Sequence, residues 1–201
     1  MPTLNQILAE SDSPPLAPGL TEKFTAYLQL LQRWNQKTNL TSIRDDEGIL
    51  RRHFVESILC AQNLPANIAT LLDYGSGAGF PGIPIALVRP GIDVTLAESQ
   101  NKKAAFLREV VRTLDLQTKV HSGRAEQLTT HYECITLRAV DHMELAIPAA
   151  IQLLSPNGWL AIMTTTSELQ SIQQAASELE WHPPLPLPAT TTRRLLLGKK
   201  S

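Results

Sequence analysis

The sequence predicts an α/β protein with a doubly wound, mostly parallel sheet and an N-terminal helical extension. In the first third of the chain, apolar residues recur at spacings of three and four, which is typical of helices. From about residue 68, short apolar runs alternate with amphipathic segments, as strands do with connecting helices. Because such crossovers are right-handed and cover both faces of a sheet, we expect a doubly wound topology.

Length and composition fit one domain with an extension, or one large domain, with enough apolar residues for a core. The 201 residues are 43% hydrophobic, and we divide them into an extension at 1–66 and an α/β domain at 67–201. The two cysteines, Cys60 and Cys134, lie far apart and form no CxxC pair, so we expect neither a disulfide framework nor a metal site. No run resembles a membrane span or a signal peptide, which makes the cytoplasm the expected compartment.

The extension is predicted to contain two helices. Residues 20–37 place one apolar face at helical spacing, and Thr21 or an adjacent residue is the expected cap; the face comprises Phe24, Tyr27, Leu28, Leu31 and Trp34. A polar break at 39–46 follows. The next helix spans 47–64, with Asp45 or Asp46 as its cap.

The α/β domain begins with a buried strand at 68–75 and a helix at 80–89, which the Pro-Gly pair at 90–91 ends. A strand at 93–99 leads into a strongly amphipathic helix at 101–116, with Ser99 as a plausible cap. The alternation then continues to the end of the chain, with strands at 118–126, 132–140, 159–166 and 190–200, and helices at 143–154 and 167–180.

A glycine loop, "GSGAGFPGIP", follows the first strand. Gly75, Gly77 and Gly79 let the backbone approach a ligand closely at a helix N-terminus. Phe80 stands where a dinucleotide-binding G-x-G-x-x-G loop has its last glycine, and the nearby prolines remove N–H donors that a pyrophosphate would use. Asp73, just before the loop, suits a ligand with an ammonium group. The loop therefore favours S-adenosylmethionine, although Asp73 could instead only hold the loop backbone.

Two further strand ends complete the expected cofactor site. Glu98 ends the second strand, where a carboxylate can accept hydrogen bonds from both ribose hydroxyls; the alternative is a surface or helix-capping acid. Ala125, in the turn after the third strand, is placed to offer backbone groups to an adenine edge. An ordinary polar exit loop is an equally open reading of that turn.

The fourth strand should end beside the methyl acceptor, and Arg138 stands there in "TLRAV". The sequence lacks an Asn/Asp-Pro-Pro-aromatic motif and a Pro-Cys nucleophile. Arginine is a permanent cation and cannot act as a general base. This suits guanine N7, which has a free lone pair and no proton, so that catalysis would rest on alignment and exclusion of water. The alternative for Arg138 is a structural ion pair with a nearby acid.

The net charge of −1 neither indicates nor excludes a nucleic-acid partner, because a local basic patch is sufficient for attraction. Basic residues gather in two places, and each group could be an RNA track or an ordinary solvated face. One group comprises Arg33, Lys37, Arg44, Arg51, Arg52 and His53; the other comprises Arg193, Arg194, Lys199 and Lys200.

These motifs resemble the RsmG (GidB) family. "NLTSIRD", "RHFVES", "LLDYGSGAGFPGIPIA", "GRAE" and "LRAV" occur in that family's order, over about residues 20 to 165. The resemblance implies a Rossmann-like, S-adenosylmethionine-dependent methyltransferase that modifies guanine N7 in 16S rRNA of the small ribosomal subunit. It implies cofactor contacts from Asp73, Gly75, Ser76, Gly77, Gly79, Phe80, Glu98, Ala125 and Glu126. It implies that the RNA or the transferred methyl faces Asn39, Arg44, His53 and Arg138.

The chain departs from the family pattern in two places. Glu56 replaces the usual Asp, and Met163 and Thr164 occupy the region of a Lys-Gly pair after the fifth strand. The missing cation bears on the strength of RNA binding. We expect a monomer with no membrane or metal partner. The rival hypotheses are a methyltransferase of a small molecule or protein, and a non-catalytic nucleotide-binding interaction protein.

Overall fold

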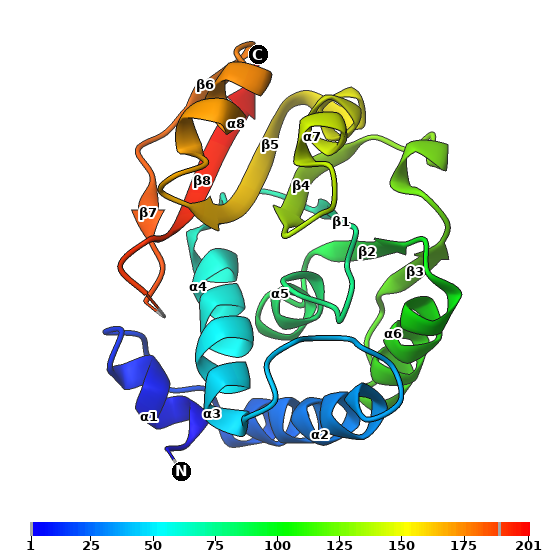
Figure 1. Cartoon of the computed structure of the whole chain (residues 1–201), viewed down its shortest axis with the longest axis vertical. Coiled ribbons are helices and arrows are strands. Elements are labelled where there is room, and N and C mark those ends of the chain that lie inside the picture. Colours follow the sequence, from blue (N-terminus) through cyan, green and yellow to red (C-terminus); the bar gives the residue numbers. More distant parts are fainter. Residues whose placement is uncertain (1, 189) are drawn as a thin grey trace.

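The computed structural model describes residues 2–188 and 190–201; position 1 of the predicted extension and position 189 of the predicted α/β domain lie outside the described residues. Within these ranges, eight strands form one sheet in the order β3-β2-β1-β4-β5-β8-β6, with β7 also paired to β8 (Figure 1). The first five strands run parallel and are β1 (Thr70–Tyr74), β2 (Asp93–Glu98), β3 (Lys119–Ser122), β4 (Tyr132–Arg138) and β5 (Leu154–Thr165). Antiparallel pairing then adds β6 (Leu179–Trp181), β7 (Leu185–Pro186) and β8 (Arg193–Lys200).

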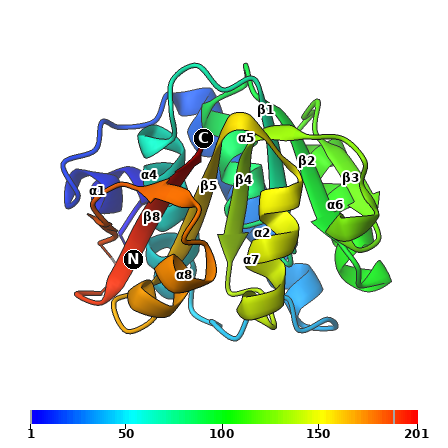
Figure 2. The same cartoon turned by 90° about the horizontal axis from the view of Figure 1, so that it is seen from above.

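Helices cover both faces of the sheet, so the predicted α/β fold is confirmed (Figure 2). Alternate residues of a strand point to opposite faces. Leu71 therefore packs with the helices α5 (Gly82–Val88) and α6 (Asn101–Thr113), whereas Leu72 packs with α7 (Met143–Gln152) and α8 (Leu169–Ala175).

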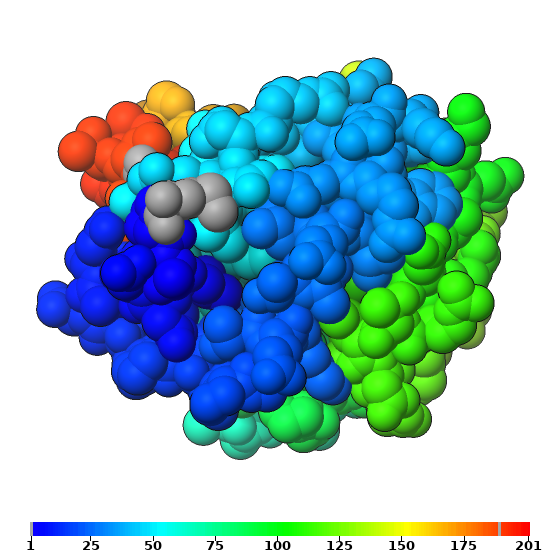
Figure 3. Space-filling view, turned by 90° about the horizontal axis from the view of Figure 1, so that it is seen from below, coloured from blue at the N-terminus to red at the C-terminus, as the bar shows by residue number. Residues whose placement is uncertain are grey.

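The extension lies on the same face of the sheet as α5 and α6, where its last helix packs beside α5 and its longest helix packs over α6 (Figure 1). It contains α1 (Leu4–Ala9), α2 (Pro18–Asn35), α3 (Asp46–Ile49), a π-helical turn η1 (Leu50–Val55) and α4 (Glu56–Asn63). Figure 3 shows the blue and cyan surface of the extension beside the green surface that includes α6. Trp34 Nε1 donates to Glu109 at 2.8 Å and Lys23 Nζ donates to the Leu114 carbonyl at 2.7 Å, which fixes α2 against α6.

Helix capping agrees with the prediction in one place and differs in two. Asp45 caps α3, where its side chain accepts the Gly48 N–H at 2.7 Å. The Thr21 cap was wrong, because α2 already begins at Pro18, a residue that suits the first helical position. The predicted Ser99 cap was also wrong. Gln100 is the cap residue of α6, and its N–H donates a hydrogen bond to the Glu98 carboxylate at 2.7 Å.

Short elements account for the remaining differences. The predicted helix 167–180 ends at Ala175, and residues 179–181 form β6 against β8. The predicted strand 118–126 ends at Ser122, where a single 3-10 turn η2 (Ala125–Gln127) follows. Three-residue strands and single turns are too short to produce a periodic pattern. In the described part of the chain, no helix is both long and apolar enough to cross a membrane.

Candidate active site and cofactor pocket

A cavity of about 550 Å³ opens at the carboxyl edge of the parallel strands, beside the ends of β1 and β4. The strand order reverses between these two strands, which is where doubly wound sheets bind ligands. The wall comes from segments that are far apart in the sequence: 40–42, His53, 74–78, Phe80, 97–100, Lys103, 123–126, 138–142, Leu145 and Ala146.

The glycine loop forms the floor of this cavity. At Gly79 the backbone φ is +91°, and a Cβ there would lie 2.7 Å from the Tyr27 hydroxyl and 2.8 Å from Ile83, so another residue would be strained and would displace these side chains. Gly82 allows a second close approach, because its Cβ would lie 2.7 Å from Asp73 Oδ2. This packing of α5 on β1 was missed in the sequence, although the Gly-x-x-Gly spacing from Gly79 to Gly82 signals it.

Glu98 lies at the end of β2 with 5% of its surface exposed, and it lines the cavity. Its Oε2 accepts the Gly77 N–H at 2.9 Å, and its Oε1 accepts the Gln100 N–H at 2.7 Å. A carboxylate has about four lone-pair sites, so each oxygen keeps acceptor capacity toward the cavity. The carboxylate is therefore held in one orientation and suits a pair of ribose hydroxyls.

Asp73 lies behind the loop and is not on the cavity wall. Oδ1 accepts the Thr136 hydroxyl at 2.7 Å and Oδ2 accepts the Gly82 N–H at 3.2 Å. Burial raises the pKa of this carboxyl to about 6, against the opposing effect of its hydrogen bonds. Of the two roles considered from the sequence, this geometry matches the one that holds the backbone. Gly79 likewise supports the loop from outside the wall, whereas Gly75, Ser76 and Gly77 line it.

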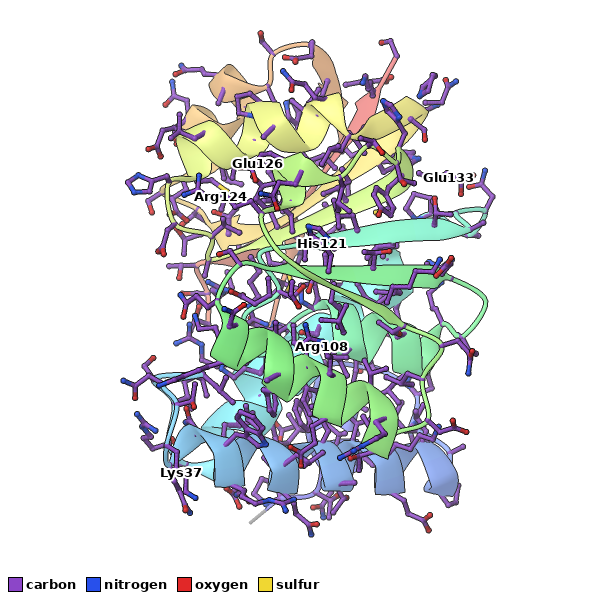
Figure 4. All side chains as sticks on the ribbon, turned by 90° about the vertical axis from the view of Figure 1, so that its right-hand side faces the viewer. Lys37, Arg108, His121, Arg124, Glu126 and Glu133 are labelled. Atoms are coloured by element: carbon purple, nitrogen blue, oxygen red, sulfur yellow. The ribbon has the colours of Figure 1, made fainter. Side chains whose placement is uncertain are left out.

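The turn after β3 supplies the other side of the predicted cofactor site. Ala125 and Glu126 line the cavity in η2. The Gly123 N–H donates to the Glu98 carbonyl at 3.1 Å, which ties this turn to the end of β2. Figure 4 shows Arg124 and Glu126 at one edge of the sheet and Glu133 at the other. Burial and the neighbouring Glu126 raise the pKa of Tyr74, which lies on the same wall.

Arg138 lines the cavity from the end of β4 and is also ion-paired. Its surroundings therefore fit both interpretations from the sequence, a role toward the methyl acceptor and a structural ion pair. It is 9% exposed, and its Nη2 lies 3.0 Å from Glu56 Oε2. The same nitrogen donates to the Arg52 carbonyl, and Nη1 donates to Ser57 Oγ at 3.3 Å. Burial lowers the pKa of the guanidinium to about 10 while the Glu56 carboxylate opposes the shift, so Arg138 is a cation at neutral pH.

His53 and Phe80 form the wall between the extension and the loop. Their rings are stacked with centroids 4.7 Å apart, and the Tyr27 ring lies 5.3 Å from Phe80. His53 Nε2 lies 2.7 Å from the Thr41 hydroxyl. Burial, followed by the charges of three nearby arginines, lowers the pKa of His53 to about 3, so the imidazole is neutral at pH 7.

Asn39 and Arg44 lie off the cavity wall. Arg44 donates from Nη2 to Asn39 Oδ1 at 3.1 Å and from Nη1 to the Asn35 carbonyl at 3.0 Å. Both residues flank the segment 40–42, which does line the cavity, so their contact with RNA stays a prediction. Thr41 and Ser42 were not predicted as site residues, since no spacing in the chain signals that this loop reaches the glycine loop.

Among residues 2–188 and 190–201, no group of three or more His, Cys, Asp or Glu side chains is arranged to hold a metal ion. On the cavity wall beside the end of β4, the buried ionisable side chains are a cation, Arg138, and a neutral imidazole, His53. Asp141 and His142 lie at its exposed rim. The buried wall is therefore suited to orienting an electron-rich acceptor and poorly suited to removing a proton from it.

The family model for "rRNA small subunit methyltransferase G" (GidB) matches residues 20–192. A "Ribosomal RNA small subunit methyltransferase G" from Roseiflexus sp. (strain RS-1) is 37% identical over 166 residues, which cover 79% of this chain and 71% of the relative. The protein of the same name from Stenotrophomonas maltophilia is 43% identical over 164 residues, or 80% of this chain and 75% of the relative.

Solved structures share the fold at low sequence identity. A SAM-dependent methyltransferase from Aquifex aeolicus aligns with a TM-score of 0.63 and 16% identity, over 78% of this chain and 95% of the other. P. horikoshii TYW2 in complex with MeSAdo aligns with a TM-score of 0.59 and 15% identity, over 74% of this chain and 62% of the other. These likenesses concern the Rossmann-like architecture of the sheet and its helices.

Proposed function

This chain belongs to the rRNA small subunit methyltransferase G (GidB) family, and on that basis we propose that it transfers a methyl group from S-adenosylmethionine to N7 of a guanine in 16S rRNA. The observation that carries the proposal is the cavity at the ends of β1 and β4. It joins a glycine loop and a fixed carboxylate to a buried cation contributed by β4.

The cofactor arm of the cavity fits S-adenosylmethionine. Glu98 offers two oriented acceptor oxygens for ribose hydroxyls, and Ala125 and Glu126 offer backbone and side-chain groups for the adenine. Pro81 and Pro84 have no N–H to offer a pyrophosphate. When bound, S-adenosylmethionine supplies an electrophilic methyl group on a sulfonium centre.

The acceptor arm suits a base that needs no deprotonation. Arg138 is charged and held by three hydrogen bonds, so it can orient guanine through O6 or hold an adjacent phosphate. His53, with its pKa lowered to about 3, is a weak base. Guanine N7 carries a free lone pair, so alignment and exclusion of water are sufficient for the transfer.

The proposal extends to the partner and the compartment. The substrate is rRNA of the small ribosomal subunit, and we place the protein in the cytoplasm as a monomer. Lys37 lies on the same side of the molecule as Arg124 and Glu126 (Figure 4), which supports the proposal that this lysine contacts the backbone of an RNA that enters the cavity. The predicted boundary between extension and α/β domain, 1–66 and 67–201, falls between α4 and β1.

A labelling experiment tests the function. Purified protein is incubated with methyl-labelled S-adenosylmethionine and small subunits from cells that lack this methyltransferase, and the modified nucleotide is mapped. We expect label on 16S rRNA as 7-methylguanosine. Label found only on protein or small molecules would replace this function with that of another methyltransferase. No transfer at all, with cofactor still bound, would favour a non-catalytic protein.

A further inference from the structure

We infer that Glu56 is a positioning residue of this active site, and that Arg193 on the C-terminal strand fixes Glu56 in that role. The inference rests on the proposed function and adds two residues to the site. Neither lines the cavity. Both act through Arg138, the cation at the acceptor end.

Three segments meet at this cluster. Glu56 begins α4 directly after the π-helical turn, Arg138 ends β4, and Arg193 begins β8. A single oxygen, Glu56 Oε2, lies 3.0 Å from Arg138 Nη2 and 3.3 Å from Arg193 Nη2. The carboxylate therefore ties the helical extension to two strands of the sheet.

The hydrogen bonds leave the Arg138 guanidinium one orientation. Nη2 donates to the Arg52 carbonyl and to Glu56, and Nη1 donates to Ser57 Oγ. Arginine has five N–H donors, so Nε–H and one Nη1–H have no hydrogen-bond partner within the described ranges. Because Arg138 lines the cavity, these are the donors left for an acceptor base or phosphate.

The charge balance favours function over stability as the reason for this cluster. Glu56 is fully buried, and one negative charge faces two guanidinium groups whose side chains are 6% and 13% exposed. Glu56 Oε1 and Arg193 Nε are buried without a hydrogen-bond partner in the described part of the chain. Buried ion pairs with unsatisfied atoms are poor stabilising devices. The excess positive charge is instead complementary to an electron-rich or anionic group at the end of the cavity.

The test compares variants in steady-state methylation of unmodified small subunits, with cofactor affinity measured separately by calorimetry. Glu56→Gln removes the charge and keeps the side-chain size. We expect kcat to fall about tenfold or more, because the guanidinium loses its fixed orientation. We expect the KM for subunits and the Kd for S-adenosylmethionine to stay within about twofold of wild type. Glu56→Asp keeps the charge, and we expect it to recover most of the lost kcat.

Glu47→Gln is the matched control. Glu47 is a carboxylate of the same helical stretch that pairs with Arg51 at 2.8 Å, and its side chain is 46% exposed. We expect it to leave kcat unchanged. If Glu56→Gln does not fold, Arg193→Gln tests the same restraint from β8, and we expect a smaller fall in kcat with unchanged cofactor affinity.

Two results overturn the inference. One is an unchanged kcat in folded Glu56→Gln or Arg193→Gln protein. The other is a parallel loss of kcat, cofactor affinity and melting temperature, which would assign the cluster a purely structural role. A wild-type protein that binds cofactor and methylates no subunits would instead contradict the proposed function, so the two failures are distinguishable.

Discussion

Glu98 is the side chain on which we expect the proposed cofactor site to depend most, because it holds two backbone amides and also lines the cavity. Its two oxygens accept the Gly77 and Gln100 amides, one on the glycine loop and one at the start of α6. The same carboxylate lines the cavity. A change at this position therefore affects the shape of the loop and the acceptors for a ribose.

We expect Glu98→Gln to weaken S-adenosylmethionine binding about 10-fold to 100-fold. The amide nitrogen of glutamine cannot accept a hydrogen bond, so the side chain loses one backbone contact and one acceptor for a ribose hydroxyl. Isothermal titration calorimetry measures the effect. Glu133→Gln is the matched control: Glu133 Oε2 accepts the Ala69 N–H at 2.5 Å, at the opposite edge of the sheet (Figure 4). Equal affinities in both variants would remove Glu98 from the site.

His53 predicts a pH dependence of stability. Its folded-state pKa of about 3 lies below the ordinary value of 6.5, so the unfolded chain binds the proton more readily. Stability from this residue is complete above pH 6.5 and falls as the pH is lowered toward 3. The loss is at most about 1.4 kcal/mol per pH unit, or about 2 kcal/mol between pH 6.5 and pH 5.

His53→Gln should flatten that fall, as measured by urea unfolding at pH 7 and pH 5. Because the pKa of Asp73 is raised to about 6, protonation of this carboxyl stabilises the folded protein as the pH falls below 6. This contribution is the same in wild type and variant, so it cancels in the comparison. His131→Gln, at an exposed position, should retain the wild-type pH dependence. If the free energy of unfolding of His53→Gln falls between pH 7 and pH 5 as much as that of wild type, His53 does not resist protonation in the folded protein.

At the scale of elements, α2 positions the glycine loop. The Tyr27 hydroxyl donates to the Ala78 carbonyl at 2.5 Å, and the fully buried Tyr27 ring lies against Phe80. The loop is thus held from the extension as well as from β1. The geometry of the cofactor arm therefore depends on a helix outside the α/β domain.

Tyr27→Phe tests this dependence. Removing the hydroxyl leaves the Ala78 carbonyl without its buried donor, and we expect the free energy of unfolding to fall by about 1–3 kcal/mol. We also expect weaker S-adenosylmethionine binding. Tyr132→Phe is the control, since Tyr132 is 5% exposed and its hydroxyl makes no hydrogen bond among the described residues. If cofactor affinity is wild-type in Tyr27→Phe, α2 does not control the loop.

Local signals predicted the elements that carry the site. The apolar run, the glycines and the following helix identified β1, the loop and α5. Asp45 was one of the two residues predicted to cap the next helix, and its carboxylate accepts the N–H of Gly48, three residues later. Contacts across long sequence separations could not be predicted: Tyr27 meets Ala78 51 positions later, and Glu56 meets Arg138 82 positions later. Only the folded sheet brings such pairs together.

At the scale of the whole molecule, the extension and the sheet share one core. Phe24 and Phe54 of the extension belong to the same buried cluster as Phe106 of α6 and Leu71 of β1. The rings of Phe24 and Phe54 lie 5.3 Å apart, and Trp34 meets Phe106 at 5.7 Å. Although 1–66 and 67–201 were distinguished by their sequence patterns, the packing gives no reason for them to fold separately.

We therefore expect the full chain to unfold in one cooperative transition and the fragment 67–201 to show none. Without the extension, the outer surfaces of α5 and α6 become an exposed apolar face. The free energy of apolar burial lost in this way exceeds the few kcal/mol by which a domain of this size is stable. Near-UV circular dichroism and scanning calorimetry measure both proteins. Deleting residues 1–9 removes only α1 and should lower the melting temperature while cooperativity is retained. A sharp transition in 67–201 would show that the α/β domain folds on its own and that the extension docks onto a finished sheet.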